Sequence, residues 1–455
     1  MEAVIDLGRD LIVQRKLRSY FLNALLNRKT RSFMRWFRET RRRLLRRQHV
    51  VSAFLQLDDP YSYLLAHYLP SLAQDYDIEL RLYLSEARGG AYQPAPEMLA
   101  EYAANDCRRL ARELGIPFLD KGATPPVEQR RSMMDSIAAC QGEEQFDDEL
   151  LQALGVFWRG DAEAASRRSV SAALQGVADV VVRDAAERQE QLGHYNSAML
   201  HYEGEWYWGV DRLHYLLDRL QDVGAASRES ISPLLASIRQ AAQITLPVAP
   251  PTAAKKLPAL ELFHSVRSPY SYLALVRLSE IADAFGLILQ IRPVLPMVMR
   301  GMQVPKQKLL YIARDTAREA DRRGIAFGKL ADPVGLGTER CLAVFRYADS
   351  KQQGRTFLLN AGEAIWSQAT DMATDAGLRK VTDKTGLSWT EVKAALGSDE
   401  WRATVEENRE SMMRSGSWGV PTIRMGEFIA WGQDRDWLLV RHIEELCETG
   451  DGIIV

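Results

Sequence analysis

Several patterns are scarce in this sequence, and each absence excludes a class of protein. Four cysteines occur in 455 residues, and they form no CxxC pair and no metal-ligand spacing. So few unpaired cysteines favour buried thiols in a reducing compartment over a secreted disulfide scaffold. The chain has no apolar run of about 18 residues and no short apolar segment behind a basic start, so we expect neither a spanning helix nor a cleavable signal. These absences together favour a cytoplasmic protein.

A strong excess of charge of either sign is also missing. Lys plus Arg (58) and Asp plus Glu (60) nearly cancel, which gives no clear indication of a nucleic-acid partner. The distribution is uneven, because residues 1–48 hold fourteen basic and four acidic residues, which leaves 44 basic and 56 acidic residues elsewhere. With 46% hydrophobic residues, a chain of this length can form two or three domains with buried cores.

The sequence contains an internal repeat. "PYSYL" occurs at residues 60–64 and again at 269–273, an offset of 209 residues. The same offset aligns residues 101–118 with 310–327, where eight of the eighteen columns are identical. A repeat of this length indicates two copies of one structural unit. We therefore interpret the chain as a tandem duplication.

Each repeat shows the same order of predicted elements. In the second repeat, strand-like runs at 259–265 and 287–294 flank a helical pattern. About a hundred residues with helical spacing follow, and two short strands and a helix close the repeat at 421–446. The first repeat begins in the same way, with strand-like runs at 50–57 and 78–84. We predict an α/β fold with two tandem domains, each with an inserted helical subdomain.

The chain divides into four predicted segments. Residues 1–48 form a basic amphipathic helical arm, 49–225 a first domain, 226–257 a linker and 258–455 a second domain. The linker depends on the stretch "ITLPVAPPTAAKKLPAL" at 244–260, whose prolines and alanines favour an extended connector.

The corner between the first strand and the first helix of the second repeat has the sequence "SPYS", Ser268 to Ser271. Pro269 lies in the first helical turn, where a missing N–H does no harm. The Ser268 hydroxyl then lies beside unpaired backbone N–H groups and the positive end of the helix dipole, which suits an anion. The alternative is that Ser268 only caps the helix, a common role of serine that is worth about 1 kcal/mol.

A second candidate element is "SWGVPT", in which Val420 and Pro421 open a strand. Proline at a strand start marks an edge, and X-Pro bonds in tight turns are where cis peptides occur. "WGQDR" follows, with Gln433 and Asp434 at the start of the last helix. An acid in the first turn of a helix most often stabilises the helix dipole.

Together these features resemble the DsbA-like thioredoxin-fold family, which includes DsbA-type oxidoreductases, 2-hydroxychromene-2-carboxylate isomerases and kappa-class glutathione transferases. The resemblance covers residues 258–446 well and 49–222 more loosely. The oxidoreductases have Cys-Pro-x-Cys at the corner, and thiol–disulfide exchange requires a sulfur nucleophile. Because Ser268 and Ser271 occupy both cysteine positions, dithiol redox chemistry at this corner is excluded.

The resemblance implies glutathione-dependent chemistry in the second domain. In the isomerase and transferase branches the corner serine is understood to hydrogen-bond the thiol of glutathione, and such a donor favours the thiolate. Ser268 is then the catalytic residue, and Val420, held by a cis Pro421, pairs with the cysteinyl part of the tripeptide. Gln433 and Asp434 receive its γ-glutamyl end. The implied substrate is a small electrophile, which is isomerised or conjugated, and no metal is expected.

The first repeat departs from this pattern. Asp59 replaces the serine, and the stretch Ser197 to Met199 replaces the proline turn. A carboxylate beside a thiolate repels it and raises its pKa. We therefore expect a catalytically silent domain that packs on the second as half of a pseudo-dimer. We interpret His194, His201 and His214, near its last strands, as packing residues rather than a metal site.

Two further interpretations concern contacts within the chain. Asp315 and Arg318 recur in both repeats, which predicts packing or ion pairing on the inserted helix. The segment "RSFMRWFRETRRRLLRR" at 31–47 interleaves basic and apolar residues at helical spacing. It suits an anionic membrane surface or a nucleic acid, but we expect it to dock on the acidic remainder of the chain.

A different class of function stays open. The protein is then a non-enzymatic binding or scaffold module, in which the groove beside Pro421 holds a protein segment. The partly degraded repeat and the basic arm favour this alternative. The term disulfide oxidoreductase then applies only to the wider family as a whole.

Overall fold

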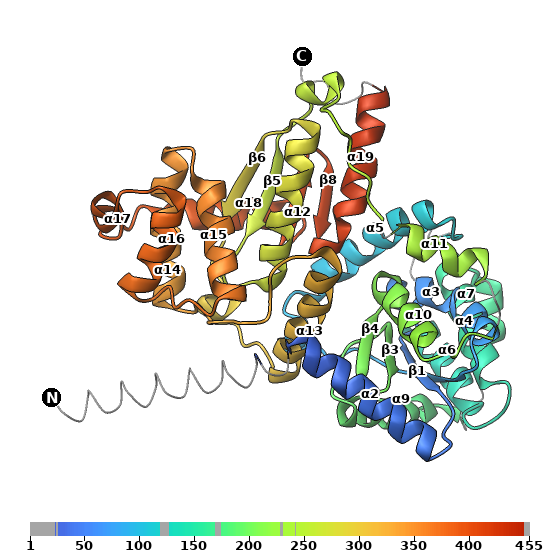
Figure 1. Cartoon of the computed structure of the whole chain (residues 1–455). Helices are drawn as coiled ribbons and strands as arrows, with labels where there is room; N and C mark the ends of the chain where they lie inside the picture. Colours follow the sequence, from blue (N-terminus) through green and yellow to red (C-terminus); the bar gives the residue numbers. More distant parts are fainter. Residues whose placement is uncertain are drawn as a thin grey trace. The chain divides into compact units, whose positions relative to one another are not determined.

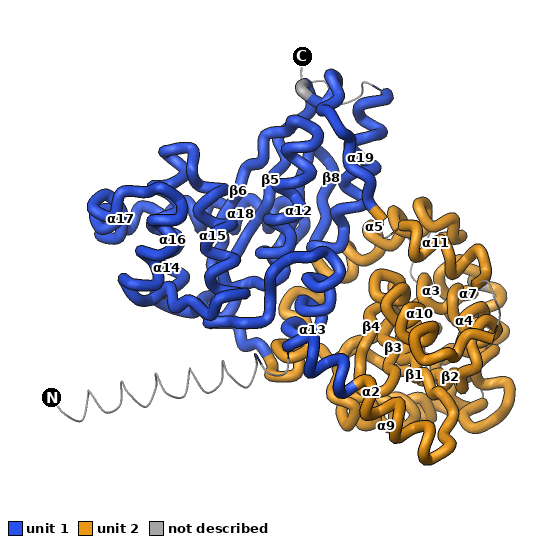
Figure 2. Tube along the Cα trace, in the orientation of Figure 1, with its two compact units in different colours: residues 1–34, 244–304, 312–455 blue, residues 35–243, 305–311 orange. Residues whose placement is uncertain are grey.

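The computed structural model describes residues 23, 26–118, 127–168, 174–227, 231–241 and 243–449. Residues 1–22 of the predicted arm, parts of the predicted linker and the last residues from 450 lie outside this described part. The chain divides into two compact units, shown in Figure 2. Unit 1 groups residues 1–34, 244–304 and 312–455, and unit 2 groups residues 35–243 and 305–311.

Most strands and helices of unit 1 come from the C-terminal half of the chain. They are η4 (Thr252–Lys256), β5 (Leu260–His264), α12 (Pro269–Phe285), β6 (Leu289–Pro293), η5 (Met297–Arg300), α13 (Lys306–Arg323), α14 (Leu336–Ser350), α15 (Gly354–Ser367), α16 (Asp375–Thr385), α17 (Trp389–Ala395), α18 (Trp401–Arg414), β7 (Thr422–Met425), β8 (Phe428–Trp431), η6 (Gln433–Arg435) and α19 (Asp436–Thr449). The first turn of α13 groups with unit 2.

Unit 2 contains the elements of the N-terminal half. They are α2 (Arg28–Leu44), β1 (Val50–Leu55), α3 (Pro60–Ala66), α4 (Leu69–Asp75), β2 (Glu79–Leu84), η1 (Gly90–Tyr92), α5 (Pro96–Leu114), α6 (Val127–Ala139), α7 (Phe146–Arg159), α8 (Ala162–Arg167), α9 (Val177–Gln191), β3 (Met199–Tyr202), β4 (Glu205–Trp208), η3 (Val210–Arg212), α10 (Leu213–Asp222) and α11 (Pro233–Ala241). The beginning of α2 groups with unit 1.

Each unit is built around one sheet, and within the described residues the two sheets have the same topology (Figure 1). The strand order is β6-β5-β7-β8 in unit 1 and β2-β1-β3-β4 in unit 2. In both sheets the first two strands in sequence are parallel, and the last two add as an antiparallel pair. The predicted strands are therefore confirmed in both repeats, with their ends shifted by a few residues.

Both faces of the unit 1 sheet are covered, which explains why its central strand is almost wholly apolar. On one face α12 and α19 contact each other (Figure 1). On the other face Met412 of α18 joins Phe263 and Val294 in a buried cluster. Successive residues of a strand point to opposite faces, so Leu262 and Phe263 are both fully buried but in different layers.

The predicted helical insertion is present between β6 and β7, where α13 to α18 follow one another. Helices α14, α15, α16 and α17 contact their neighbours in this group, and α15 also packs on α12. The approach of α15 to α12 is close, because a Cβ added to Gly362 would lie 2.4 Å from Cδ2 of Tyr272. Glycine at this position therefore lets the insertion dock on the helix that carries the predicted site.

The first helix differs between the repeats. In unit 1 it is continuous over 17 residues as α12, whereas in unit 2 it is divided into α3 and α4. Pro70 lies at the beginning of α4, where Ser279 stands in the second repeat. Proline has no N–H for the helical ladder and clashes with the preceding turn, so Pro70 explains the break.

Candidate functional site

The topology of unit 1 places the predicted site residues at one edge of its sheet. β5 ends at His264, and Ser268 follows as the residue before α12. β7 runs antiparallel to β5, with Thr422 opposite Phe263. Residues 420–421 therefore enter the sheet at the end where β5 leaves it.

The last predicted segment returns to this same edge. β8 is antiparallel to β7, with Trp431 opposite Thr422, so the chain reaches η6 directly beyond the start of β7. The residues of η6, Gln433 to Arg435, contact α12. Three segments that are far apart in the sequence thus meet at the beginning of α12.

Ser268 is the N-cap of α12. Its backbone is extended, with φ −93° and ψ 115°, and its Oγ accepts a hydrogen bond from the backbone N–H of Ser271 at 3.1 Å. The predicted capping role is therefore confirmed. The residue is only partly buried, and the accepted bond uses a lone pair, so the hydroxyl proton is still available for a second acceptor. A role toward a thiol stays a prediction.

Side chains around the corner hold it in place. The hydroxyl of Ser271 accepts a hydrogen bond from the backbone N–H of Ser265 at 3.3 Å. The hydroxyl of Tyr270 donates to Oδ2 of Asp315 at 2.8 Å, and Arg318 forms an ion pair with the same buried carboxylate. The predicted pairing of Asp315 and Arg318 is thus confirmed, and it ties α13 to the corner.

The turn before β7 contains a cis peptide bond between Val420 and Pro421. Val420 is partly buried against the cluster that includes Phe263 and Met412. The carbonyl oxygen of Pro421 accepts a hydrogen bond from the backbone N–H of Gly432 at 3.0 Å. The turn is therefore connected to both β5 and the segment that leads into η6.

Hydrogen bonds of short side chains stabilise the same turn. The hydroxyl of Thr422 donates to the carbonyl oxygen of Gly419 at 2.6 Å and contacts the hydroxyl of Ser417 at the same distance. A Cβ added to Gly419 would lie 2.6 Å from Nε1 of Trp431. Contacts this short do not occur for real side chains, so only glycine fits at residue 419 without moving the indole.

The two polar residues of η6 have different surroundings. Gln433 is 2% exposed, and its Nε2 donates to Oε2 of Glu319 at 3.1 Å. The side chain of Asp434 is 12% exposed, and its Oδ1 lies 3.6 Å from Nη1 of Arg435, which is almost completely buried. Asp434 thus has a small accessible surface at the edge, whereas the Gln433 amide already has an acidic partner. Their roles toward a γ-glutamyl group stay predictions.

His264, the last residue of β5, belongs to no motif of the sequence. It is 3% exposed, and burial lowers the pKa of its imidazole to about 3. Among the described residues its Nδ1 has no hydrogen-bond partner. The signal that could have found it is a polar residue at the end of an apolar strand where the first repeat has Leu55.

The corner of the first repeat is occupied by its own carboxylate. Oδ1 of Asp59 accepts a hydrogen bond from the backbone N–H of Tyr61 at 3.2 Å. Oδ2 accepts one from the backbone N–H of Ser62 at 3.2 Å and one from the Ser62 hydroxyl at 2.7 Å. Burial raises the pKa of Asp59, although part of its surface is accessible. This group satisfies the helix terminus and offers no hydroxyl donor to a ligand.

The histidines of the first repeat pack against aromatic rings. The ring of His194 is stacked on Tyr195, with centroids 4.8 Å apart, and lies 4.7 Å from the ring of Trp206. Nε2 of His201 accepts a hydrogen bond from the backbone N–H of Gly204 at 3.1 Å, and burial lowers the pKa of His201 to about 4. The packing interpretation is confirmed for these two residues. No cluster of three potential metal ligands is found among the residues that the structure describes.

The four cysteines are free thiols in the structure, and none lies at the corner. Burial raises the pKa of Cys341 to about 12, so this thiol is un-ionised at neutral pH.

A cleft of about 750 Å³ lies along β6 in unit 1. Its lining comes from β6, from α14, α15 and α18 and from Asp283 near the C-terminal end of α12, and it includes Arg292, Phe345, Asp349 and Trp401. None of the predicted site residues contributes to this lining. The cleft is therefore distinct from the edge at the beginning of α12, and we assign it no role in the proposed chemistry.

The basic arm docks through its arginines. Nε and Nη2 of Arg35 donate to the two carboxylate oxygens of Glu205, both at 2.6 Å. Nη1 of Arg38 donates to the carbonyl oxygen of Glu203 at 2.6 Å. The prediction that the arm docks on acidic parts of the chain is confirmed for these residues.

Comparisons with known proteins identify one matching family model and several similar proteins. Residues 259–444 match the DSBA-like thioredoxin domain. A 2-hydroxychromene-2-carboxylate isomerase of Pseudomonas putida is 24% identical over 196 residues, which are 41% of this chain and 95% of that protein. A protein of the same name from Sphingobium xenophagum is 23% identical over 184 residues, 39% of this chain and 93% of that protein.

A solved structure of a 2-hydroxychromene-2-carboxylate isomerase is 24% identical, covers 42% of this chain and 97% of its own, and superposes with a TM-score of 0.38. The residues that match the family model, 259–444, include the serine corner, the turn at Pro421 and η6, and they end within α19. The resemblance inferred from these motifs is thus confirmed: residues 259–444 match the DSBA-like thioredoxin domain, and 41% of the chain is similar to a 2-hydroxychromene-2-carboxylate isomerase.

Proposed function

We propose that unit 1 is a glutathione-dependent isomerase or transferase, in which Ser268 stabilises the thiolate of bound glutathione against a small electrophile. The observation that carries this proposal is the position of the Ser268 hydroxyl. It is partly exposed at the beginning of a 17-residue helix, where the redox branch of the family has its attacking cysteine. The similar proteins that are named 2-hydroxychromene-2-carboxylate isomerase also support an isomerase function.

The physical effect of Ser268 follows from its hydrogen bonds. Its Oγ already accepts from the N–H of Ser271, so the hydroxyl acts outward as a donor. A hydrogen bond to a charged group contributes about 1.5–3 kcal/mol, and one pKa unit corresponds to about 1.4 kcal/mol. A donor of this strength, together with the helix dipole, lowers the pKa of a bound thiol by about one to two units. A free thiol with a pKa near 8.5 then has a pKa of about 6.5–7.5, so that roughly a quarter to three quarters of it is ionised at pH 7.

The residues at the edge fit the tripeptide in part. The backbone of Val420 lies at the start of β7, where an extended peptide can pair with it, and Asp434 offers an accessible carboxylate for an ammonium group. Gln433 fits less well, because its amide is bonded to Glu319. When bound, glutathione supplies the thiolate nucleophile. The chain's own contribution is to orient the tripeptide and to stabilise its charge.

We further propose that the first repeat shares its origin with the second and has lost this chemistry. The two sheets have the same strand order. In addition, the hydroxyl of Tyr61 donates to Asp106 at 2.8 Å, as that of Tyr270 donates to Asp315. The carboxylate of Asp59 at the corner cannot replace the donor of Ser268 toward a thiolate.

One observation favours the second candidate, a non-enzymatic binding module. The buried bond between Gln433 and Glu319 already uses one N–H of a predicted γ-glutamyl ligand. In a binding module, a protein segment would pair with the backbone of the turn beside Pro421. Such binding does not require a thiolate beside Ser268. The two candidates therefore differ in whether glutathione binds and whether its thiol pKa is lowered.

The test is calorimetric titration of glutathione into the wild type and Ser268→Ala, combined with a pH titration of the thiolate absorbance of the bound tripeptide. We expect both proteins to bind, with a thiol pKa about one to two units higher in the variant. Thr374→Ala is the matched control, because Thr374 caps α16 by accepting from the N–H of Gly377 at 3.0 Å and has no part in the site. Absence of glutathione binding in the wild type would favour the binding module instead.

A further inference from the structure

The arm helix α2 presents an unexpected side to solvent. In most helices on a protein surface the apolar side faces the body and the charged side faces water. Here Arg35, Arg38 and Arg42 are among the partly buried residues, together with Thr30, Arg31, Glu39 and Thr40. Trp36 is 61% exposed and Leu44 is 79% exposed. The helix is therefore turned with its aromatic side outward.

Specific bonds hold this orientation. Both carboxylate oxygens of Glu205 accept from Arg35, and a planar two-bond contact of this kind fixes the direction of the guanidinium. The carbonyl oxygen of Arg35 in turn accepts from Nη2 of Arg219 at 3.3 Å. The guanidinium of Arg38 lies so close to the β3–β4 turn that a Cβ on Gly204 would be 2.5 Å from it. The inward side of α2 thus fits this hairpin in detail.

Exposed apolar residues gather along α2 and directly after its last residue, Leu44. We define the aromatic face as Trp36, Phe37, Leu44 and Leu45, all of which belong to the part of the chain that follows residue 34. Phe37 and Leu44 are seven residues apart, which is two helical turns, so they lie on the same side of α2. Phe33, one turn before Phe37, is exposed as well. Apolar side chains that gather on one exposed surface indicate an interaction site, whereas single exposed ones do not.

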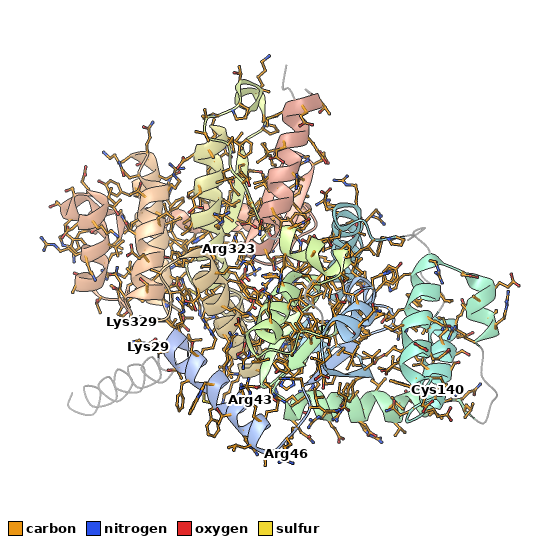
Figure 3. The ribbon with its side chains drawn as sticks, turned by 45° about the vertical axis from the view of Figure 1, so that its right-hand side comes forward. Lys29, Arg43, Arg46, Cys140, Arg323 and Lys329 are labelled. Carbon is orange, nitrogen blue, oxygen red and sulfur yellow. The ribbon has the colours of Figure 1, made fainter. Side chains whose placement is uncertain are left out.

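Exposed basic residues surround the aromatic face. We define the basic rim as Arg41, Arg43, Arg46 and Arg47, which are all exposed. Figure 3 labels Arg43 and Arg46 toward the end of α2, and Lys29 near its beginning. Glu39 is the one acidic residue within α2, and it forms ion pairs with Arg42 and Arg43. An apolar centre with a cationic border matches the two layers of an anionic membrane surface, its acyl chains and its headgroups.

From this arrangement we infer that α2 is a membrane-docking helix, which lies flat on an anionic lipid surface with the aromatic face inserted and the basic rim among the headgroups. Aromatic side chains are favoured at this depth of a bilayer. No helix in the described part of the chain is long and apolar enough to cross a membrane, so the contact is an in-plane one. The inference does not depend on the chemistry proposed for Ser268.

A nucleic acid is the weaker match for the same surface. Nucleic-acid affinity depends on guanidinium and ammonium groups that reach phosphates. Arg35 and Arg38 are bound to Glu205 and to the carbonyl of Glu203, and the centre of the outward side is apolar. A lipid surface uses both the apolar centre and the cationic border, whereas a phosphate backbone uses only the border.

The test is cosedimentation of the full chain with vesicles of equal parts phosphatidylglycerol and phosphatidylcholine, and with vesicles of phosphatidylcholine alone. We expect binding to the anionic vesicles and at least tenfold weaker binding to the neutral ones, since each basic residue near the surface adds to the attraction. The double variant Trp36→Ser with Phe37→Ser is expected to lose about tenfold or more in binding. Val248→Ser with Ile288→Ser is the matched control, because it removes two apolar residues that are also exposed.

A second variant separates the charges from the apolar contact. The triple change Arg41→Gln, Arg46→Gln and Arg47→Gln is expected to weaken binding to the anionic vesicles by about tenfold and to leave the neutral ones unaffected. Thermal unfolding is measured for every variant. A lowered unfolding temperature for Trp36→Ser with Phe37→Ser overturns the inference, because it shows that the chain itself covers these rings.

Three other results also overturn it. The first is the absence of wild-type binding to the anionic vesicles. The second is tighter binding to a single-stranded oligonucleotide than to vesicles, which assigns the surface to nucleic acid. The third is a concentration-dependent dimer that disappears in the Trp36→Ser and Phe37→Ser variant, which assigns the aromatic face to a second copy of this chain.

Discussion

The hydroxyl of Tyr270 donates a hydrogen bond of 2.8 Å to the carboxylate of Asp315. Tyr270 belongs to the serine corner, and Asp315 lies in the middle of α13, so this one bond joins the start of the site helix to the inserted helices. The same contact recurs in the first repeat between Tyr61 and Asp106. Because the bond is also present where Asp59 stands in place of the serine, we expect it to serve the fold rather than the proposed chemistry.

The first prediction concerns the strength of this bond. Tyr270→Phe removes the hydrogen bond that the Tyr270 hydroxyl donates to the buried Asp315 carboxylate, and the loss of a donor to a buried acceptor costs about 1–3 kcal/mol. We expect the free energy of unfolding, measured by urea titration, to fall by this amount. Tyr347→Phe is the matched control, because Tyr347 donates to Glu391 at an exposed position, where the change is expected to stay within about 0.5 kcal/mol. Equal effects in the two variants would contradict the prediction.

The second prediction concerns pH and His264. Burial lowers the pKa of this imidazole from 6.5 to about 3, so the unfolded chain binds a proton that the folded chain does not. The stability of the folded state therefore falls as the pH drops below 6.5, by up to about 1.4 kcal/mol per pH unit. His264→Leu, which copies Leu55 of the first repeat, removes this contribution.

The measurement for His264 is a pair of urea titrations near neutral pH and near pH 5. We expect the variant to gain about 2 kcal/mol relative to the wild type between the two conditions. A difference between the two proteins that does not change with pH would show that the imidazole is protonated in the folded state as easily as in the unfolded one.

The third prediction concerns the carboxylate of the first corner. Burial raises the pKa of Asp59 above its ordinary value of 3.8, so ionisation of this group opposes folding. The penalty is absent below pH 3.8 and is fully present above the raised pKa. Asp59→Asn keeps an acceptor for the helix N–H groups but carries no charge. Relative to the wild type, we expect the variant to become more stable as the pH rises from about 3.5 to 7.

The control for Asp59 has the opposite sign. Hydrogen bonds from Lys393 and from Arg340 lower the pKa of the exposed Asp375, so this carboxylate stabilises the fold above pH 3.8 and loses its effect as the pH falls. Asp375→Asn is therefore expected to be less stable than the wild type at neutral pH and to approach it in acid. The same slope for both variants would mean that burial does not govern Asp59.

The sequence predicts those parts of the fold that depend on local pattern. The strands, the helix cap at Ser268 and the pairing of Asp315 with Arg318 follow from residue spacing and from the repeat, because each depends on residues within a few turns or on a second copy of the same segment. The break at Pro70 was not predicted, although it depends on an equally local cause, the missing N–H of proline.

Contacts between distant residues were not predictable in the same way. The partner of Gln433 is Glu319, 114 residues earlier in the chain, and no pattern in either segment indicates it. The arm helix α2 shows most clearly how a local pattern differs from a contact between distant residues. Its periodicity identifies which residues share a side of α2, but the side that meets the body is decided by Glu205, far along the chain, and by the strong two-bond contact it forms with Arg35.

The last prediction tests Asp434, the remaining charged ligand proposed for glutathione. If its carboxylate meets the γ-glutamyl ammonium, Asp434→Asn weakens glutathione binding by about tenfold, which corresponds to about 1.4 kcal/mol. N-acetylated glutathione, which has no ammonium, is expected to bind the wild type more weakly by a similar factor. Because both changes remove the same contact, their effects should not add. Calorimetry of the two proteins with the two tripeptides gives this double comparison.

A matched control separates the contact from the general charge of the domain. Asp383→Asn removes an exposed carboxylate of the same unit, which pairs with Arg379 at 3.7 Å, and we expect it to leave both affinities unchanged. If the effects of Asp434→Asn and of N-acetylation add fully, the ammonium binds elsewhere. Asp434 then takes no part in binding, and the serine hydroxyl and the backbone at Val420 hold the tripeptide.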